Sequence, residues 1–292
     1  MAGRLSFEDE ISRNKTKSFI LMLVIFFFII GLGMLISLVV DPDLFFIFTI
    51  FATIFSLVYI WAGYYFSDKI ALASVNAKPA DKIKHGMLFH SIENMSIASG
   101  LPMPKVYVME SKEINAFASG RNPENAVICV TSGALEKLNK EELEGVIAHE
   151  MSHIANLDIR FMTLTAVLVG MLSIIAQMFL RSLWYGNRDR EGKGNIALMV
   201  AAIVAAILAP IAAQLVQLAI SRKREYGADA TGVKFTRYPM GLRNALIKIK
   251  NEHVPQDEKR RYNKAVAPLF ISDPFKKKVQ NLFSTHPDIN NR

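Results

Sequence analysis

His149, Glu150 and His153 are the residues of this sequence whose types and spacing indicate chemistry most directly. Residues four apart lie on one face of an α-helix, so the two imidazoles can bind a single Zn²⁺ together. The Glu150 carboxylate, next to the first ligand, can take a proton from a zinc-bound water, whose pKa falls to about 7. The pattern indicates hydrolysis, most often of a peptide bond. The alternative is a polar helix whose two histidines bind nothing, and the flanking sequence must decide between the two.

The residues around these three predict the helix that the metal geometry needs. Asn139 is a candidate N-cap, and Glu142 three residues later completes a capping-box pattern. Apolar residues recur at helical spacing and form a stripe: Leu143, Val146, Ile147, Ile154 and Leu157. The two histidines therefore lie well inside a predicted helix.

A catalytic zinc site needs three protein ligands and one open position. Glu225 is the candidate for the third ligand of one Zn²⁺ per subunit. Asp229, one helical turn later, is the candidate to accept a hydrogen bond from the outer nitrogen of a zinc-bound imidazole. The alternative for this segment is an exposed helix of mixed charge, and the presence of the two histidines favours the ligand interpretation.

Four motifs in this order resemble those of the HtpX-type zinc metallopeptidases, which are membrane-embedded gluzincins related to the CAAX prenyl proteases. They are Ile-Asn-Ala-Phe-Ala at 114–118, residues 145–153, residues 221–229 and Ser-Thr-His-Pro at 284–287. The resemblance covers nearly the whole chain, although the family usually continues beyond the position of Arg292. It implies that His286 donates a hydrogen bond to the oxyanion of the transition state. The alternative for His286 is a bystander beside a helix N-cap signal.

The fold class expected is mainly α, α+β: a multi-helix membrane anchor and a gluzincin-type zinc peptidase domain containing a small antiparallel sheet. A helix is predicted over 80–99, ended by Gly100, and strands over 105–109, 114–119 and 126–130. The edge strand could pair with an extended substrate backbone. Asn115, Ala116 and Phe117 are the candidate substrate-binding residues, and the alternative for Asn115 is a polar residue at a strand start.

The composition agrees with a membrane enzyme, because 51% of the residues are hydrophobic. Stretches 19–40 and 44–66 are long enough to cross a hydrocarbon core of about 30 Å. Stretches 163–180 and 196–220 are less purely apolar, and a buried core helix is the alternative for them. We expect residues 1–68 to form an anchor with two transmembrane helices. Residues 69–292 then form the peptidase domain, interrupted by a membrane hairpin at about 161–220.

Basic residues predict the orientation in the membrane. Arg4, Arg13, Lys15 and Lys17 precede the first apolar stretch, whereas the turn at 41–43 carries no base. The positive-inside rule then places the N-terminus in the cytoplasm. His153 and Glu225 flank the hairpin and must reach one metal, so the hairpin crosses the membrane an even number of times. The bases of its connecting loop favour a shallow hairpin as the alternative to two full crossings.

The expected function is that of a multi-pass, plasma-membrane zinc endopeptidase with its catalytic domain in the cytoplasm. The resemblance implies quality control of misfolded or damaged membrane proteins. The alternatives are a processing peptidase for one prenylated or signal-type substrate and a catalytically idle zinc-binding scaffold. The net charge of +8 suits bases that face anionic lipid, so nucleic-acid binding is not required. Cys129, the sole cysteine, forms no internal disulfide and is expected to be buried in a strand.

Overall fold

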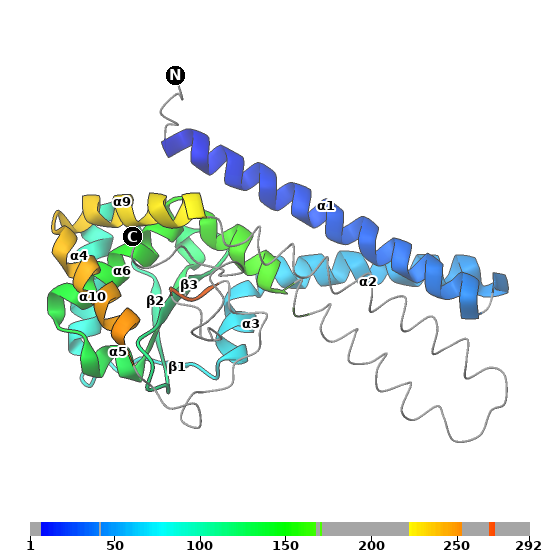
Figure 1. The fold of residues 1–292 in the computed structure, drawn as a ribbon. Helices are drawn as coiled ribbons and strands as arrows, with labels where there is room; N and C mark the ends of the chain where they lie inside the picture. Colours follow the sequence, from blue (N-terminus) through cyan, green and yellow to red (C-terminus); the bar gives the residue numbers. More distant parts are fainter. Residues whose placement is uncertain (1–6, 41, 168–169, 171–221, 253–268, 272–292) are drawn as a thin grey trace.

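Two long helices project together from a globular part of the molecule (Figure 1). The computed structural model describes residues 7–40, 42–167, 170, 222–252 and 269–271. Helix α1 (Phe7–Val40) is followed by the short turn η1 (Pro42–Leu44) and by helix α2 (Phe45–Tyr65), which packs against α1. Helix α1 begins at Phe7 rather than at the predicted position 19, because its polar first turns contain good helix formers such as Glu, Lys and Arg.

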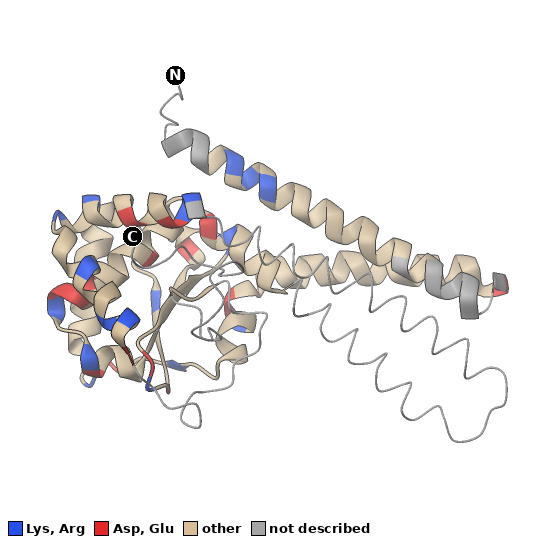
Figure 2. Cartoon of the chain, in the orientation of Figure 1, with Lys and Arg blue, Asp and Glu red and all other residues tan. Residues whose placement is uncertain are grey.

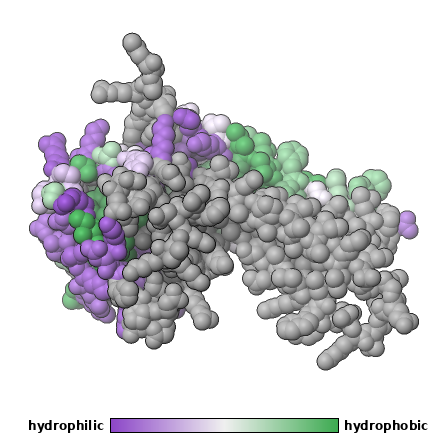
Figure 3. Space-filling model, viewed as in Figure 1, coloured by the Kyte–Doolittle hydropathy of each residue, from purple (hydrophilic) through white to green (hydrophobic). Residues whose placement is uncertain are grey.

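The projecting helices have the composition and exposure expected in lipid. Within the described residues, 11–31 and 45–65 are each long and apolar enough to cross a membrane. Only 11% of the α2 segment is buried, and Phe46 and Phe51 are 77% and 67% exposed. Charged residues gather on the globular part and near the start of α1 (Figure 2), and apolar surface follows the projection (Figure 3). Apolar helices that bury so little of their surface need an apolar medium around them.

The sheet lies in the globular part and has four strands in the order β1-β2-β4-β3. They are β1 (Lys78–Pro79), β2 (Lys105–Met109), β3 (Ala116–Ser119) and β4 (Val127–Thr131). The predicted hairpin is present, with β3 antiparallel to β4. The sheet as a whole is mixed, however, because β2 runs parallel to β4. The wholly antiparallel arrangement that we expected was therefore wrong.

Burial explains this strand order. All five residues of β4 are buried, which suits a central strand. The chain reaches the far edge first as β3, and then turns through Gly120 and η2 (Pro123–Asn125) to place β4 between β3 and β2. Strand propensity identifies such segments without giving their relative direction. Cys129 lies in β4 and is fully buried, as predicted, and burial raises the pKa of its thiol.

The helices of the globular part surround α6 (Lys140–Ala155), which packs against α4 (Gly86–Ser99), α9 (Arg222–Thr236), α10 (Pro239–Asn251) and β3. The globular part also contains the short helices α3 (Ser67–Ser74) and α5 (Ser132–Lys137), and residues 158–167 are helical. Helix α4 ends at Gly100 as predicted, but it begins at residue 86 rather than 80. The Asp81 carboxylate accepts hydrogen bonds from the Ile83 and Lys84 amides and holds a turn there instead.

Helix α6 is the centre of the hydrophobic core. Leu143, Ile147, Met151 and Ile154 are fully buried, and each such side chain contributes about 2 kcal/mol by leaving water. Gly145 lies directly against the backbone of Leu242 at the start of α10, where any side chain would collide. The helix that carries the two histidines is therefore held on several sides. A rigid support of this kind is what a site with defined geometry requires.

A candidate metal centre on helix α6

The N-terminus of α6 is fixed by the predicted capping box. The Asn139 side chain accepts a hydrogen bond of 2.9 Å from the Glu142 amide, and the Glu142 carboxylate accepts one of 2.8 Å from the Asn139 amide. Lys248 of α10 donates to the same carboxylate at 2.6 Å. The start of the helix sets the direction in which each later side chain points, so these contacts determine where residues 149, 150 and 153 face.

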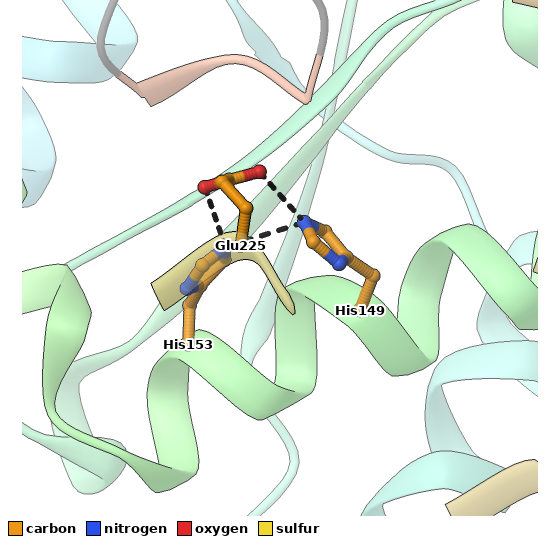
Figure 4. Close-up of side chains that lie close together, drawn as sticks. All are labelled: His149, His153 and Glu225. Carbon is orange, nitrogen blue, oxygen red and sulfur yellow. Dashed lines mark hydrogen bonds and ion pairs between the residues drawn. The ribbon is translucent and has the colours of Figure 1, made fainter. Parts of the chain in front are cut away.

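His149, His153 and Glu225 converge beneath the sheet (Figure 4). The two Nε2 atoms are 3.2 Å apart. Glu225 Oε2 lies 3.7 Å from His149 Nε2, and Glu225 Oε1 lies 3.7 Å from His153 Nε2. All three side chains are buried. Donors at about 2.0–2.1 Å from a tetrahedral Zn²⁺ would lie roughly 3.3 Å from each other. These residues, whose donor atoms all lie within 4.8 Å of one another, could therefore hold one metal ion.

A carboxylate lies behind each imidazole. The His149 Nδ1 atom is 2.9 Å from Asp229, and the His153 Nδ1 atom is 3.0 Å from Asp158. When both rings are neutral, each Nδ1 donates its proton to the carboxylate behind it and each Nε2 keeps a lone pair. Two such lone pairs 3.2 Å apart can share a proton or a metal cation. The chemistry of the donor set thus fits a bound divalent metal.

Asp158 was missed by the sequence analysis. It follows His153 by five residues, which is not a helical spacing, and Leu157 between them has a positive φ of 56°. The turn at Leu157 ends α6 and directs the helix at residues 158–167 so that Asp158 points back at the ring. A carboxylate shortly after a ligand was the only available signal. Asp229, in contrast, lies against His149 as its helical spacing from Glu225 suggested.

In the metal-free protein, the environment of His153 favours its protonated form. Burial alone lowers the pKa of His153, but the hydrogen bond to Asp158 and the charges of Glu225, Asp158 and Glu150 outweigh it and raise the pKa to about 9. A metal ligand must be neutral, so metal binding at neutral pH displaces a proton from this ring.

Glu150 lies between the two histidines in sequence and is buried. Its Oε2 atom accepts a hydrogen bond of 2.8 Å from the Ala118 amide of β3. The strand therefore holds the carboxylate in one orientation. On the other side of α6, Gly232 of α9 allows a close approach, since a Cβ at this position would lie 3.1 Å from the His149 amide nitrogen.

The three candidate substrate-binding residues lie at the edge of the sheet. Asn115 is buried; its amide donates to the Thr131 hydroxyl, and its side-chain oxygen accepts from the Ala116 amide. The outer edge of β3 is already paired with residues 269–271. Phe270 forms an antiparallel bridge with Phe117, and the Ile271 amide donates to the Ala116 carbonyl at 3.0 Å.

Some predicted features lie outside the described residues. They are His286 with its Ser-Thr-His-Pro motif, and the predicted hairpin beyond residue 170. Residues 163–166, where the third apolar stretch begins, are buried. Tyr59 of α2 donates a hydrogen bond of 2.7 Å to the carbonyl of Val167, which links this segment to α2.

Two histidines and a glutamate around one point, beside a further buried glutamate, define a metal-dependent hydrolase. Residues 83–292 match the model of peptidase family M48, and the chain belongs to this family. It is 46% identical to a protease HtpX homolog of Caldanaerobacter subterraneus subsp. tengcongensis, over 83% of this chain and 82% of that protein. It is 40% identical to a protease HtpX homolog of Tropheryma whipplei strain Twist, over 97% of this chain and 94% of that protein.

The fold is also similar to that of a solved structure. S. mikatae Ste24p matches with a TM-score of 0.46 and 21% identity, over 96% of this chain and 64% of that chain. Family membership and the arrangement on α6 make the protein a metallopeptidase that cleaves peptide bonds. Its two apolar helices make it a membrane-associated one.

Proposed function

We propose that the protein is a zinc endopeptidase whose metal is held by His149, His153 and Glu225. The main support for this proposal is that the three donors converge and that a carboxylate orients each imidazole. Two nitrogen ligands and one carboxylate leave a fourth tetrahedral position open, which is the arrangement of catalytic rather than structural zinc sites. This donor set also suits Zn²⁺ better than the all-oxygen ligand sets preferred by Mg²⁺ or Ca²⁺.

Glu150 is the proposed general base. Bound Zn²⁺ would polarise the scissile carbonyl and lower the pKa of a coordinated water to about 7. Glu150 accepts a proton from the attacking water and passes it to the leaving amine. The Ala118 amide, 2.8 Å from the Glu150 carboxylate, fixes the direction from which the proton is taken. His286 is proposed, from its motif alone, as a donor to the oxyanion.

The substrate is proposed to bind as an extended strand along β3, next to Asn115, Ala116 and Phe117. The Ala116 carbonyl already accepts a hydrogen bond from Ile271, so a substrate strand takes the place of residues 269–271. Phe270→Ala removes the ring that packs on Phe117 at 5.4 Å and should lower the KM for an unfolded protein substrate by several-fold. An increased KM would place the substrate elsewhere.

The substrates are proposed to be misfolded membrane proteins, reached from the cytoplasm. Residues 1–68 serve as the anchor and residues 69–292 as the peptidase domain, interrupted by a hairpin at about 161–220. The bases on the first turns of α1 support this orientation. A cysteine introduced at Asn251 should react with a membrane-impermeant maleimide only after cell lysis. Labelling in intact cells would exclude the cytoplasmic assignment.

Glu150→Gln tests the proposed function most directly. The variant should keep one zinc per chain and lose cleavage by at least about 100-fold, because an amide of nearly the same shape cannot accept the proton. Metal content and casein cleavage are measured on the same detergent-purified sample. Glu144→Gln is the matched control, since Glu144 is on the same helix but bonds Asn94 instead.

Glu225→Ala completes this test. It should lower zinc occupancy, because only two ligands would remain. Undiminished cleavage by Glu150→Gln would remove the base from its role, whereas full-affinity zinc in Glu225→Ala would require another third ligand. An idle zinc-binding scaffold would show zinc in the wild type without cleavage.

A further inference from the structure

The side chain of Asn14 links helix α1 to a carboxylate of the proposed metal centre. The Asn14 amide nitrogen donates a hydrogen bond of 2.8 Å to Asp158 Oδ1 and one of 2.9 Å to the Asn156 carbonyl. All three residues are buried. Asn14 is part of an apolar segment, 11–31, that is long enough to span a membrane. A buried amide there is costly unless it is bonded, so these contacts fix both its position and that of α1.

Asp158 divides its two oxygens between α1 and the metal centre. Its Oδ2 atom lies 3.0 Å from His153 Nδ1, while Oδ1 accepts from Asn14 and lies 3.9 Å from Arg224. A carboxylate that is bonded at both oxygens has a fixed plane. The ring it contacts is consequently held at one angle, and so is the Nε2 atom that faces the metal position.

We propose that Asn14 is a positioning residue for the metal ligand His153, so that the N-terminal helix forms part of the metal centre. The proposal rests on the zinc site proposed above. The line of contact runs from Asn14 to Asp158, from Asp158 to His153, and from His153 to the metal. The contact between Asn14 and Asp158 joins residues that are 144 apart in sequence. Correct docking of α1 thus becomes a condition for tight metal binding.

The surroundings of Asp158 agree with this role. A small pocket beside it is lined by Arg13, Lys17, Lys223 and Arg224, together with Asn14, Asn156 and Asp158. The bases come from α1 and α9, which also carries the ligand Glu225. A carboxylate is a strong acceptor for the His153 N–H, and the side chains from both helices hold it against the ring.

The experiment measures zinc affinity of the full-length protein in detergent by competition with a chelator. Asn14→Ala should weaken zinc binding on the order of tenfold, as losses behind a metal ligand do. Asn14→Asp keeps the shape of the side chain but places a second carboxylate against Asp158, so this variant should lose more zinc affinity than Asn14→Ala. The absorption bands of the Co²⁺-substituted protein should shift in both variants, because the ring angle changes.

Ser18→Ala is the matched control. Ser18 lies one turn along the same helix and is also buried, but its hydroxyl donates a hydrogen bond to the Asn14 carbonyl within α1. Its zinc affinity and Co²⁺ spectrum should equal those of the wild type. Equal losses in Ser18→Ala and Asn14→Ala would mean a general loosening of α1 and would overturn the proposal.

A double-mutant cycle separates this route from other effects. Asn14→Ala and Asp158→Asn should be non-additive in zinc affinity, whereas Asn14→Ala and Asp229→Asn should be additive. Additivity in both cycles, or unchanged affinity in Asn14→Ala and Asn14→Asp, would contradict the proposal. If the wild type itself binds no zinc tightly, the proposed function fails instead, so the two failures are distinguishable.

Discussion

The two imidazoles of the proposed metal centre belong to one sequence motif but are supported by different parts of the molecule. His149 is backed by Asp229, whose side chain is 15% exposed, on a helix that also carries Glu225. His153 is backed by Asp158, whose side chain is 2% exposed and is bonded to the membrane-associated helix α1. One half of the site is thus built within the peptidase domain, and the other half depends on the projecting helices. A histidine–carboxylate pair can thus be held by neighbouring helices of one domain or by a contact with a distant part of the chain.

Removal of each carboxylate should produce the largest difference between the two halves. We expect Asp158→Ala to weaken zinc about 100-fold and Asp229→Ala about tenfold, the two ends of the range for such partners. Water can replace the partly exposed Asp229, whereas loss of Asp158 also deprives the buried Asn14 and the partly buried Arg224 of a partner. Chelator competition on both purified variants measures this. Equal losses would mean that the two halves are equivalent.

The pH dependence of zinc binding should distinguish the halves next. In the metal-free protein the pKa of His153 is raised from 6.5 to about 9. Protonation of His153 therefore stabilises the metal-free fold fully below pH 6.5, and this contribution is lost as the pH rises through about 9. Zinc competes with that proton, so apparent zinc affinity should rise by about tenfold per pH unit between these limits.

Substitution of each carboxylate behind a histidine compares the pH dependence of the two halves. Asp158→Asn removes one of the negative charges that raise the pKa of His153 and weakens the acceptor of its hydrogen bond, so the rise in zinc affinity should move to lower pH. Asp229→Asn does not touch His153 and should leave the profile in place. The measurement is a series of zinc titrations with a pH-independent competitor from pH 6 to about 10. Identical shifts in both variants would contradict the assignment to His153.

A glycine on α9 should give the smallest effect, confined to the His149 half. The Cβ of Gly232→Ala would lie 3.1 Å from the His149 amide nitrogen, so α9 and α6 must separate by a few tenths of an ångström. We expect several-fold weaker zinc and a loss of about 1 kcal/mol in unfolding free energy. Gly227→Ala on the same helix meets no atom within 4 Å and should be neutral or stabilising. Equal effects of the two substitutions would show that the close approach is unimportant.

The centre of the site was accessible from sequence because it depends on local rules. Helical spacing and a capping box placed His149 and His153 on one face of α6, and the capping box is present as predicted. Asp158 and Asn14 were not accessible, because their contacts depend on the turn at Leu157 and on the docking of α1. Neither feature leaves a periodic pattern.

The sheet shows the same division between local and long-range information. The β3–β4 hairpin followed from a turn between two apolar segments, and it was predicted. The parallel pairing of β2 with β4 depends on which strand occupies the centre. That position is decided by burial against α6 and its neighbours, which short segments do not encode individually.

In the proposed binding mode along β3, peptide binding is an exchange reaction, because residues 269–271 already pair with this strand. An incoming strand gains only the difference between its own hydrogen bonds and those it displaces. Its apparent affinity is therefore reduced by the fraction of molecules in which the edge is open. Short, weakly held peptides compete poorly under these conditions, whereas a chain confined to the same bilayer is present at a high effective concentration. Selectivity for membrane-bound chains can thus arise from competition, without any pocket that reads a particular side chain.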